Sequence, residues 1–266
     1  MKQLLAVCLL IGLIGCIKNQ SANKENSSLT SEAPQNSLEK ERVLFVVSNQ
    51  HTYGETDINA ANHFAEIVLA YDVFKKSGFA IDFVSPEGGA IPIGYLSTSD
   101  SIEKQYLYDF EFMKLLKNTH KSEEIDPSRY SAVYYGGGGA AMFGVPENEQ
   151  IQKISMAIYE ENGGVVSAIC HGTAGLVNLK TKEGSFLYEG KKVNGFPDLF
   201  ENMDALYYQQ FPFSIEQTIK ERGGIFSFSA EGWDNYFVVD NRLITGQDPT
   251  AAASVAHKVV EALASK

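Results

Sequence analysis

The chain has 266 residues, with 33 acidic and 22 basic side chains and a formal net charge of −11. Lysine and arginine form no cluster of the kind that nucleic acid requires, so the sequence predicts no nucleic-acid partner. Two of the three cysteines, Cys8 and Cys16, lie in the apolar N-terminal stretch. Cys170 is therefore a single thiol with no intrachain partner, and this favours a chemical role for it.

The N-terminal stretch has the pattern of an export signal. An uncharged apolar run, Leu4–Ile14, is followed directly by Gly15 and Cys16. The run has the length of a secretory hydrophobic region and is short for a membrane span. The four residues that end at Cys16 fit the bacterial lipobox, in which cleavage before the cysteine leaves it lipidated. We therefore predict an exported lipoprotein of the bacterial cell envelope that Cys16 anchors to a membrane. An ordinary signal peptide and an uncleaved anchor are the alternatives.

Composition divides the chain into three predicted segments. Residues 1–16 are a lipoprotein signal peptide, residues 17–41 a disordered polar tether, and residues 42–266 one α/β domain. The tether is rich in serine, asparagine, glutamate and lysine, and it has too few apolar residues to fold. The domain is long enough to bury one sizeable core.

Short apolar runs alternate with helical patterns along this domain. The predicted strands cover residues 43–48, 80–85, 132–135, 165–169 and 192–196, with a hairpin over 237–246. The predicted helices cover residues 60–77, 101–118, 146–162, 214–222 and 250–263, and another begins after Cys170. This alternation predicts an α/β fold with a mostly parallel sheet and helices on both faces.

The stretch from Gly163 to Gly175 predicts a buried strand, a sharp turn at Cys170 and a helix. The small residues Ala168 and Gly172 fit a nucleophile elbow, which exposes the side chain at the turn. Unpaired N–H groups at the start of a helix would favour the thiolate. The alternative is a buried structural cysteine, but the adjoining His171 favours a reactive Cys–His pair.

Two further features suggest chemistry. Glu66 lies in an apolar helical segment, where burial would raise its pKa and suit it to proton transfer, unless it lies at the helix edge. The run from Gly136 to Gly139 follows a strand, and its N–H groups would form an oxyanion hole with the N–H after Cys170. A generic loop is the alternative reading. The histidines have no metal-ligand spacing, so we predict no metal and no cofactor.

These motifs together resemble the ThiJ/PfpI superfamily, which has the flavodoxin-like, class I glutamine amidotransferase-like fold. The nearest branch holds heat-shock chaperones and glyoxalase III proteins, also described as D-lactate dehydratases or deglycases. The resemblance runs from about Val43 to Leu263. It is carried by Ala-Tyr-Asp-Val-Phe-Lys-Lys-Ser-Gly-Phe at 70–79, Ala-Ile-Cys-His-Gly at 168–172 and Asp-Asn-Arg-Leu-Ile-Thr-Gly-Gln-Asp-Pro at 240–249.

The resemblance implies roles for individual residues. Cys170 would be the nucleophile, Glu66 the glutamate that shares a proton with its thiol, and His171 the histidine after the elbow. The segment from 194 to 201 resembles the one that carries the acidic partner of this histidine. That partner would be Glu201, with Asp198 as the fallback.

The glycine loop both matches the branch and departs from it. Gly137 and Gly138 match the oxyanion loop, and with His171 they would bind substrate. Gly139-Ala140 stand where the branch has His-Gly, so a pocket histidine is missing. The residues before Glu66, Asn-His-Phe-Ala at 62–65, also lack the usual Gly-aromatic pattern.

The implied activity is a glutathione-independent glyoxalase III reaction on a small aldehyde substrate. The Cys170 thiolate would attack a 2-oxoaldehyde such as methylglyoxal to give a hemithioacetal, which is converted to a 2-hydroxy acid. The alternatives are a cysteine amidase or peptidase on the same elbow, and a holdase-type stress chaperone with an oxidant-sensing Cys170. Homodimers are usual in this superfamily, so the resemblance also implies a homodimer.

Overall fold

The computed structural model describes residues 41–265. The stretch predicted as a signal peptide, with Cys16, lies outside this range, and the boundary between tether and α/β domain stays a prediction. Within the described residues, no helix has the length and apolar character needed to cross a membrane.

The described residues contain a seven-stranded sheet in the order β10-β11-β7-β6-β1-β3-β5. All neighbouring pairs are parallel except β10–β11, which form an antiparallel hairpin. The strands are β1 (Arg42–Val46), β3 (Ala80–Ser85), β5 (His120–Lys121), β6 (Ala132–Tyr135), β7 (Val165–Ile169), β10 (Phe237–Asp240) and β11 (Leu243–Gly246). Two small parallel sheets pair β2 (Asn62–His63) with β4 (Ile93–Gly94), and β8 (Lys192–Val193) with β9 (Ile225–Phe226).

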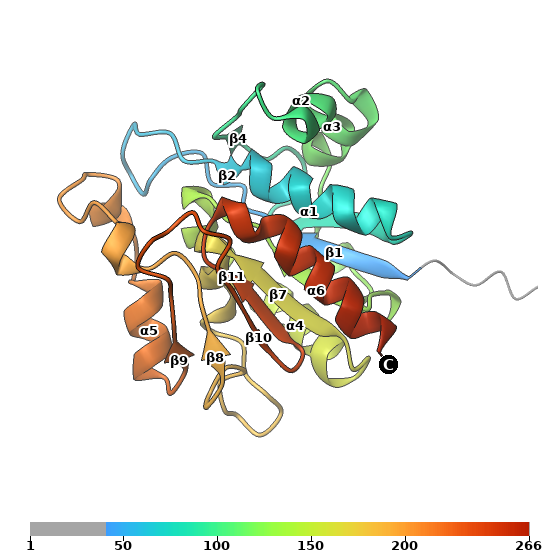
Figure 1. The fold of residues 1–266 in the computed structure, drawn as a ribbon, viewed down its shortest axis with the longest axis vertical. Helices are drawn as coiled ribbons and strands as arrows, with labels where there is room; N and C mark the ends of the chain where they lie inside the picture. The colour runs from blue at the N-terminus through green and yellow to red at the C-terminus, as the bar shows by residue number, and fades with distance from the viewer. Residues whose placement is uncertain (1–40, 266) are drawn as a thin grey trace, which may run out of the picture. The chain divides into compact units, whose positions relative to one another are not determined.

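Helices cover both faces of the large sheet. They are α1 (Phe64–Lys76), α2 (Ser101–Leu107), α3 (Phe110–Lys117), α4 (Glu149–Glu160), α5 (Ile215–Glu221) and α6 (Ala252–Ala264). In Figure 1, α1 and α6 lie side by side across the front of the sheet, and the two helices are in contact. α4 packs against β6 and β7, on the opposite face.

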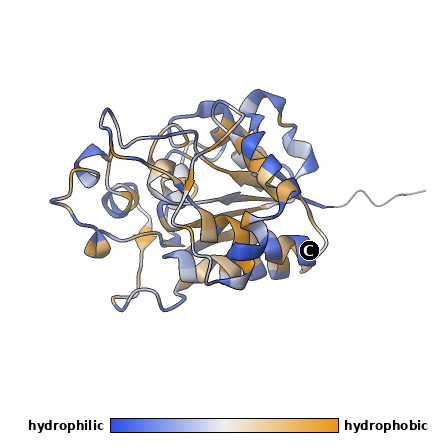
Figure 2. Cartoon of the chain, turned by 90° about the horizontal axis from the view of Figure 1, so that it is seen from above, coloured by the Kyte–Doolittle hydropathy of each residue, from blue (hydrophilic) through white to orange (hydrophobic). Residues whose placement is uncertain are grey.

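Two apolar clusters fix this layering. Along β1, Val43 and Phe45 belong to the cluster that includes α1 and α6, whereas Leu44 and Val46 belong to the cluster that includes α4. This central strand is buried on both faces and is therefore apolar from Val43 to Val46, as expected for a parallel sheet. In Figure 2 the helices carry both hydrophilic and hydrophobic residues along their length, because each has one face in a core.

The predicted fold class is confirmed, and the differences are local. The predicted helix over 101–118 is two helices, because the Asp109 side chain accepts a hydrogen bond from the Phe112 N–H and starts α3. The helix predicted from residue 60 begins at Phe64 instead, since Asn62 and His63 form β2. After Cys170 the chain forms a 3₁₀ helix, Cys170–Leu176, in place of the expected α-helix.

Candidate active site

Cys170 lies at a strained turn at the carboxyl end of β7. Its φ is +54°, a left-handed conformation that non-glycine residues seldom adopt. Such strain costs about 1–3 kcal/mol and persists only where the surrounding structure imposes it. A Cβ at Gly172 would collide with the carbonyl oxygen of Tyr135, so only glycine fits this turn. The backbone therefore has the geometry of a nucleophile elbow.

The thiol environment differs from the sequence-based expectation. Cys170 is only 4% exposed. Burial, together with the charge of Glu66, raises the pKa of the Cys170 thiol well above its usual value, while the backbone N–H of His171 acts in the opposite direction. The expectation of a thiol acidified by a helix N-terminus is therefore wrong, because burial outweighs the amide contribution. A nearby proton acceptor is needed to form the thiolate.

Glu66 is the nearby carboxyl group. It lies in the first turn of α1 and is fully buried. Its Oε2 accepts a hydrogen bond from the Gly137 N–H at 2.9 Å, and its Oε1 has no partner among the described residues that meets hydrogen-bond geometry. Burial raises the pKa of Glu66 to about 8, against the opposing influence of Cys170 and the Gly137 N–H. Because each negative charge disfavours the other, Glu66 and Cys170 do not both ionise near neutral pH.

A second chain of contacts runs from the thiol to a carboxylate. Cys170 Sγ lies 3.4 Å from His171 Nδ1, and His171 Nε2 lies 2.7 Å from Glu201 Oε1. If Nε2 donates its hydrogen to Glu201, the Nδ1 lone pair faces the sulfur and is able to accept a proton. Asp198, the alternative acid, instead accepts hydrogen bonds from Ser214, and the carboxylate that pairs with His171 is that of Glu201.

The glycine loop after β6 corrects one predicted role. The Gly137 N–H is already bonded to Glu66, so it is not free to hold an oxyanion. A Cβ on Gly137 would lie 2.5 Å from Glu66 Oε2, which explains why this position is a glycine. Gly138 has φ +92°, and a Cβ there would lie 2.5 Å from the Ala61 carbonyl oxygen. Gly138 lines the cavity beside Cys170, and its N–H is the better candidate for an oxyanion donor.

The thiol opens into a small cavity of about 190 Å³. This volume suits a substrate of a few heavy atoms rather than a peptide. The cavity is lined by His63, Tyr95, Gly138, Gly139, Cys170, His171, Phe196, Trp233 and Pro249. In the described part of the chain, no group of three or more histidine, cysteine, aspartate or glutamate side chains is placed to hold a metal ion.

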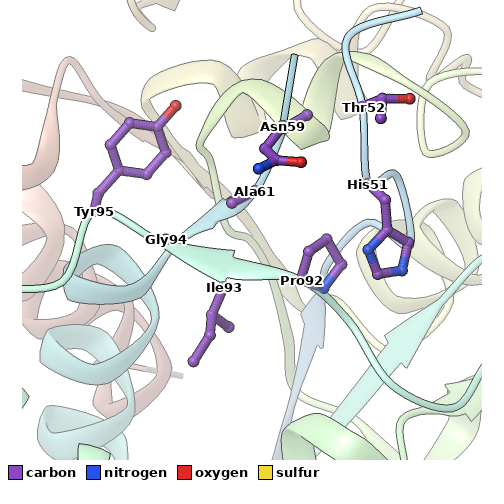
Figure 3. A pocket seen from close by; sticks show the side chains of 9 residues that line it. His51, Thr52, Asn59, Ala61, Pro92, Ile93, Gly94 and Tyr95 are labelled. Carbon is purple, nitrogen blue, oxygen red and sulfur yellow. The ribbon is translucent and has the colours of Figure 1, made fainter. Parts of the chain in front are cut away.

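A larger hollow of about 480 Å³ lies beside this cavity and shares Tyr95 with it. Figure 3 shows Tyr95 and His51 on opposite sides of this hollow, with Asn59 and Ala61 between them. Neither Cys170 nor Glu66 lines it. Cys170 and His171 line the smaller cavity, and Glu66 lies buried behind the glycine loop, bonded to the Gly137 N–H.

Sequence reasoning missed several residues of the cavity. His63 and Tyr95 come from β2 and from the loop after β4, and Trp233 comes from the loop before β10. The departure from the family pattern at 62–65 is the signal that points to His63. Tyr95 and Trp233 lie too far along the chain from the other cavity residues for local sequence to link them to the site.

Curated proteins related to this chain are named as glyoxalases. Glyoxalase 3 of Candida albicans is 30% identical, with 83% of this chain and 97% of that protein covered. Glutathione-independent glyoxalases of Schizosaccharomyces pombe and Saccharomyces cerevisiae are 33% and 32% identical, with 77% and 74% of this chain and 90% and 87% of those proteins covered.

Solved structures agree with these relatives. Glyoxalase III from Candida albicans has a TM-score of 0.75 at 28% identity, covering 84% of this chain and 97% of that chain. The Rapid Encystment Protein of Francisella tularensis has a TM-score of 0.78 at 29% identity, covering 84% of this chain and 99% of that chain.

The comparisons contradict the predicted localisation of the protein. The relatives are yeast and Candida glyoxalases, and 87–97% of their own length is matched. None of these three is named as a lipoprotein or a membrane protein. The predicted signal peptide, lipidation of Cys16, membrane anchor and envelope localisation are therefore wrong. Cys16 itself lies outside the described residues.

The model of the DJ-1/PfpI family matches residues 61–262. This range begins just before β2, after β1, and ends within α6. It includes Glu66, the glycine loop, Cys170, His171 and Glu201. On this match, and on relatives covered over nearly their whole length, the chain belongs to the DJ-1/PfpI family.

Proposed function

We propose that this chain is a glutathione-independent glyoxalase of the glyoxalase III type, which converts 2-oxoaldehydes such as methylglyoxal into 2-hydroxy acids. The names of its relatives support this activity. The observation that carries the proposal is one thiol, Cys170, flanked by two proton-transfer groups at a cavity of about 190 Å³. That cavity fits a three-carbon aldehyde.

The first step is addition of the Cys170 sulfur to the aldehyde carbon. The thiol proton passes to the ionised form of Glu66, whose raised pKa of about 8 makes it a stronger base than an ordinary carboxylate. A carbon–sulfur bond forms, and the aldehyde oxygen becomes the alkoxide of a hemithioacetal. The Gly138 N–H stabilises this oxygen until it takes the proton from Glu66.

The next step moves a hydrogen between the two substrate carbons. His171 Nδ1 removes the hydrogen of the former aldehyde carbon, and the electron pair forms a carbon–carbon double bond. Glu66 relays the proton of the aldehyde-derived hydroxyl to the ketone oxygen, which gives an enediolate. His171 then returns its proton to the former ketone carbon as the aldehyde-derived oxygen re-forms its carbonyl group, which gives a thioester. Glu201, 2.7 Å from Nε2, stabilises the transient imidazolium.

Hydrolysis completes the cycle. Water attacks the resulting thioester, the carbon–sulfur bond breaks, and the sulfur is reprotonated. The sum is one 2-oxoaldehyde plus one water giving one 2-hydroxy acid. One substrate carbon is oxidised as the other is reduced, so the reaction needs no external oxidant or reductant.

The test measures lactate formed from excess methylglyoxal by the full chain, beside Cys170→Ala and Glu66→Gln. Many equivalents of lactate per protein, lost in both variants, are expected. Consumption that stops at about one equivalent means thiol trapping and refutes the proposal. Absence of any reaction also refutes it and favours the amidase, peptidase or chaperone alternatives.

We also propose that the protein forms a homodimer, on family resemblance alone. Light scattering on the purified full chain measures its mass directly. A mass of twice the 29.2 kDa chain is expected. A mass equal to one chain at every protein concentration contradicts the proposal.

A further inference from the structure

His63 is a cavity residue that the proposed mechanism does not use. Its ring lines the cavity together with Cys170 and His171. Its backbone N–H donates to the Gly137 carbonyl oxygen at 2.9 Å, which places it against the glycine loop. His63 therefore lies on the glycine-loop side of the reacting sulfur.

The His63 ring is fixed by aromatic contacts. It stacks on Tyr95 with ring centroids 4.7 Å apart and planes only 2° from parallel. The Tyr95 hydroxyl lies 3.1 Å from the hydroxyl of Tyr53. Tyr53 in turn fills the space beside Gly139, where any Cβ would overlap its hydroxyl. The space next to Gly139 is thus occupied by a phenol that supports the stack on His63.

The hydrogen bonds of the cavity leave His63 unused. His171 contacts Cys170 Sγ through one nitrogen and Glu201 through the other, and the Tyr95 hydroxyl is paired with Tyr53. His63 Nδ1 is buried and has no partner among the described residues. A buried N–H without an acceptor is rarer in proteins than an unpaired acceptor, which favours placing the ring hydrogen on Nε2.

The ring is neutral at physiological pH. Burial, and the nearby His171, lower the pKa of His63 to about 4. A neutral imidazole offers one N–H donor, and it adds no positive charge beside the Glu66–Cys170 pair. Such a group suits a carbonyl oxygen better than a carboxylate.

We propose that His63 is a substrate-binding residue whose Nε2–H donates a hydrogen bond to the ketone oxygen of the 2-oxoaldehyde. The inference rests on the proposed function and extends it to substrate choice. With the aldehyde carbon on Cys170 Sγ, the second oxygen of a three-carbon substrate stays within the same small cavity. His63 is the histidine of that cavity with both ring nitrogens free, so it distinguishes 2-oxoaldehydes from simple aldehydes.

The test compares His63→Phe, His63→Gln and His63→Asn in the full chain with methylglyoxal. Phenylalanine keeps the stack on Tyr95 but has no donor, and a rise of about tenfold in KM with a smaller change in kcat is expected. The glutamine amide reaches the position of Nε2, so this variant retains a KM within about twofold of wild type. The asparagine amide reaches the position of Nδ1, so that variant behaves like His63→Phe.

A second readout separates binding from turnover. Lactate slows alkylation of Cys170 by iodoacetamide when it occupies the cavity. The lactate concentration for half protection is expected to rise about tenfold in His63→Phe, while the alkylation rate without lactate stays unchanged. His51→Phe is the matched control, because His51 lines the adjoining hollow instead, and both readouts should stay at wild-type values.

Each outcome has one meaning. An unchanged KM and an unchanged half-protection concentration in His63→Phe overturn the role of His63, even if wild-type turnover is intact. Wild type that binds lactate but forms no lactate from methylglyoxal refutes the proposed function. The His63 contact then stands if protection is lost in His63→Phe and kept in wild type and His51→Phe. Wild type that shows neither turnover nor protection overturns both. A changed alkylation rate without lactate reduces His63 to a structural support of the elbow.

Discussion

Replacing Glu66 with glutamine is expected to stabilise the protein while it abolishes turnover. Glutamine has the shape of protonated glutamate, so its carbonyl oxygen still accepts the Gly137 N–H. Its amide then occupies the place of the Oε1 atom that has no partner among the described residues. The variant cannot ionise, which removes a cost that the native carboxyl group carries.

The size of that cost follows from the pKa of Glu66. Folding raises it from 4.5 to about 8, and each unit corresponds to about 1.36 kcal/mol. Because the folded state binds the proton more tightly, the stabilising contribution is complete below about pH 4.5 and is lost as the pH rises to about 8. The total loss is about 5 kcal/mol, and about 3 kcal/mol is already lost at pH 7.

The assay is urea unfolding of wild type and Glu66→Gln at about pH 5, pH 7 and pH 8. The stability advantage of the variant should grow by about 4 kcal/mol between the lowest and highest pH. Glu87→Gln changes an exposed carboxylate and serves as the control. Parallel pH profiles for wild type and Glu66→Gln would refute the argument that burial raises the pKa of this carboxyl group.

Three further predictions concern the elbow and its surroundings. Glu201→Gln should lower kcat about tenfold or more in the methylglyoxal assay, since His171 loses the charge that orients its ring; an unchanged kcat would remove this residue from the mechanism. Gly172→Ala should destabilise the protein by about 1–3 kcal/mol or more, because a backbone carbonyl oxygen occupies the space of its Cβ; calorimetry with an unaltered melting temperature would contradict this. Gly139→Ala should displace Tyr53 and raise KM with little effect on the melting temperature; unaltered kinetics would show that the phenol is not needed.

The sheet was predictable because its strands are encoded locally. The runs of β6 and β7 are apolar or aromatic at every position except Ser167, and the order of strands and helices leaves few topologies for a parallel sheet. The elbow was predictable for a similar reason, since the small residues around Cys170 are needed by the turn itself.

What the sequence did not reveal depends on partners far along the chain. Asn62 leaves the predicted helix because its side chain bonds the backbone N–H and carbonyl of Ser48 and the carbonyl of Pro92. The Gly137 N–H is taken by Glu66, which lies 71 positions earlier in the chain. These contacts exist only once the sheet has formed, so no local sequence pattern predicts them.

One segment supplies much of the environment of His171. Between β8 and α5 the chain forms only short 3₁₀ turns, and from this stretch come Glu201, which bonds the imidazole, and Phe196 and Phe211, which pack on it. Tyr207, from the same stretch, holds the second oxygen of Glu201 at 3.3 Å. None of these residues belongs to the large sheet. The segment thus supplies side chains to the site from outside the sheet, and changes in its length or sequence can alter the partners of the histidine and the mouth of the cavity while the sheet that carries Cys170 stays the same.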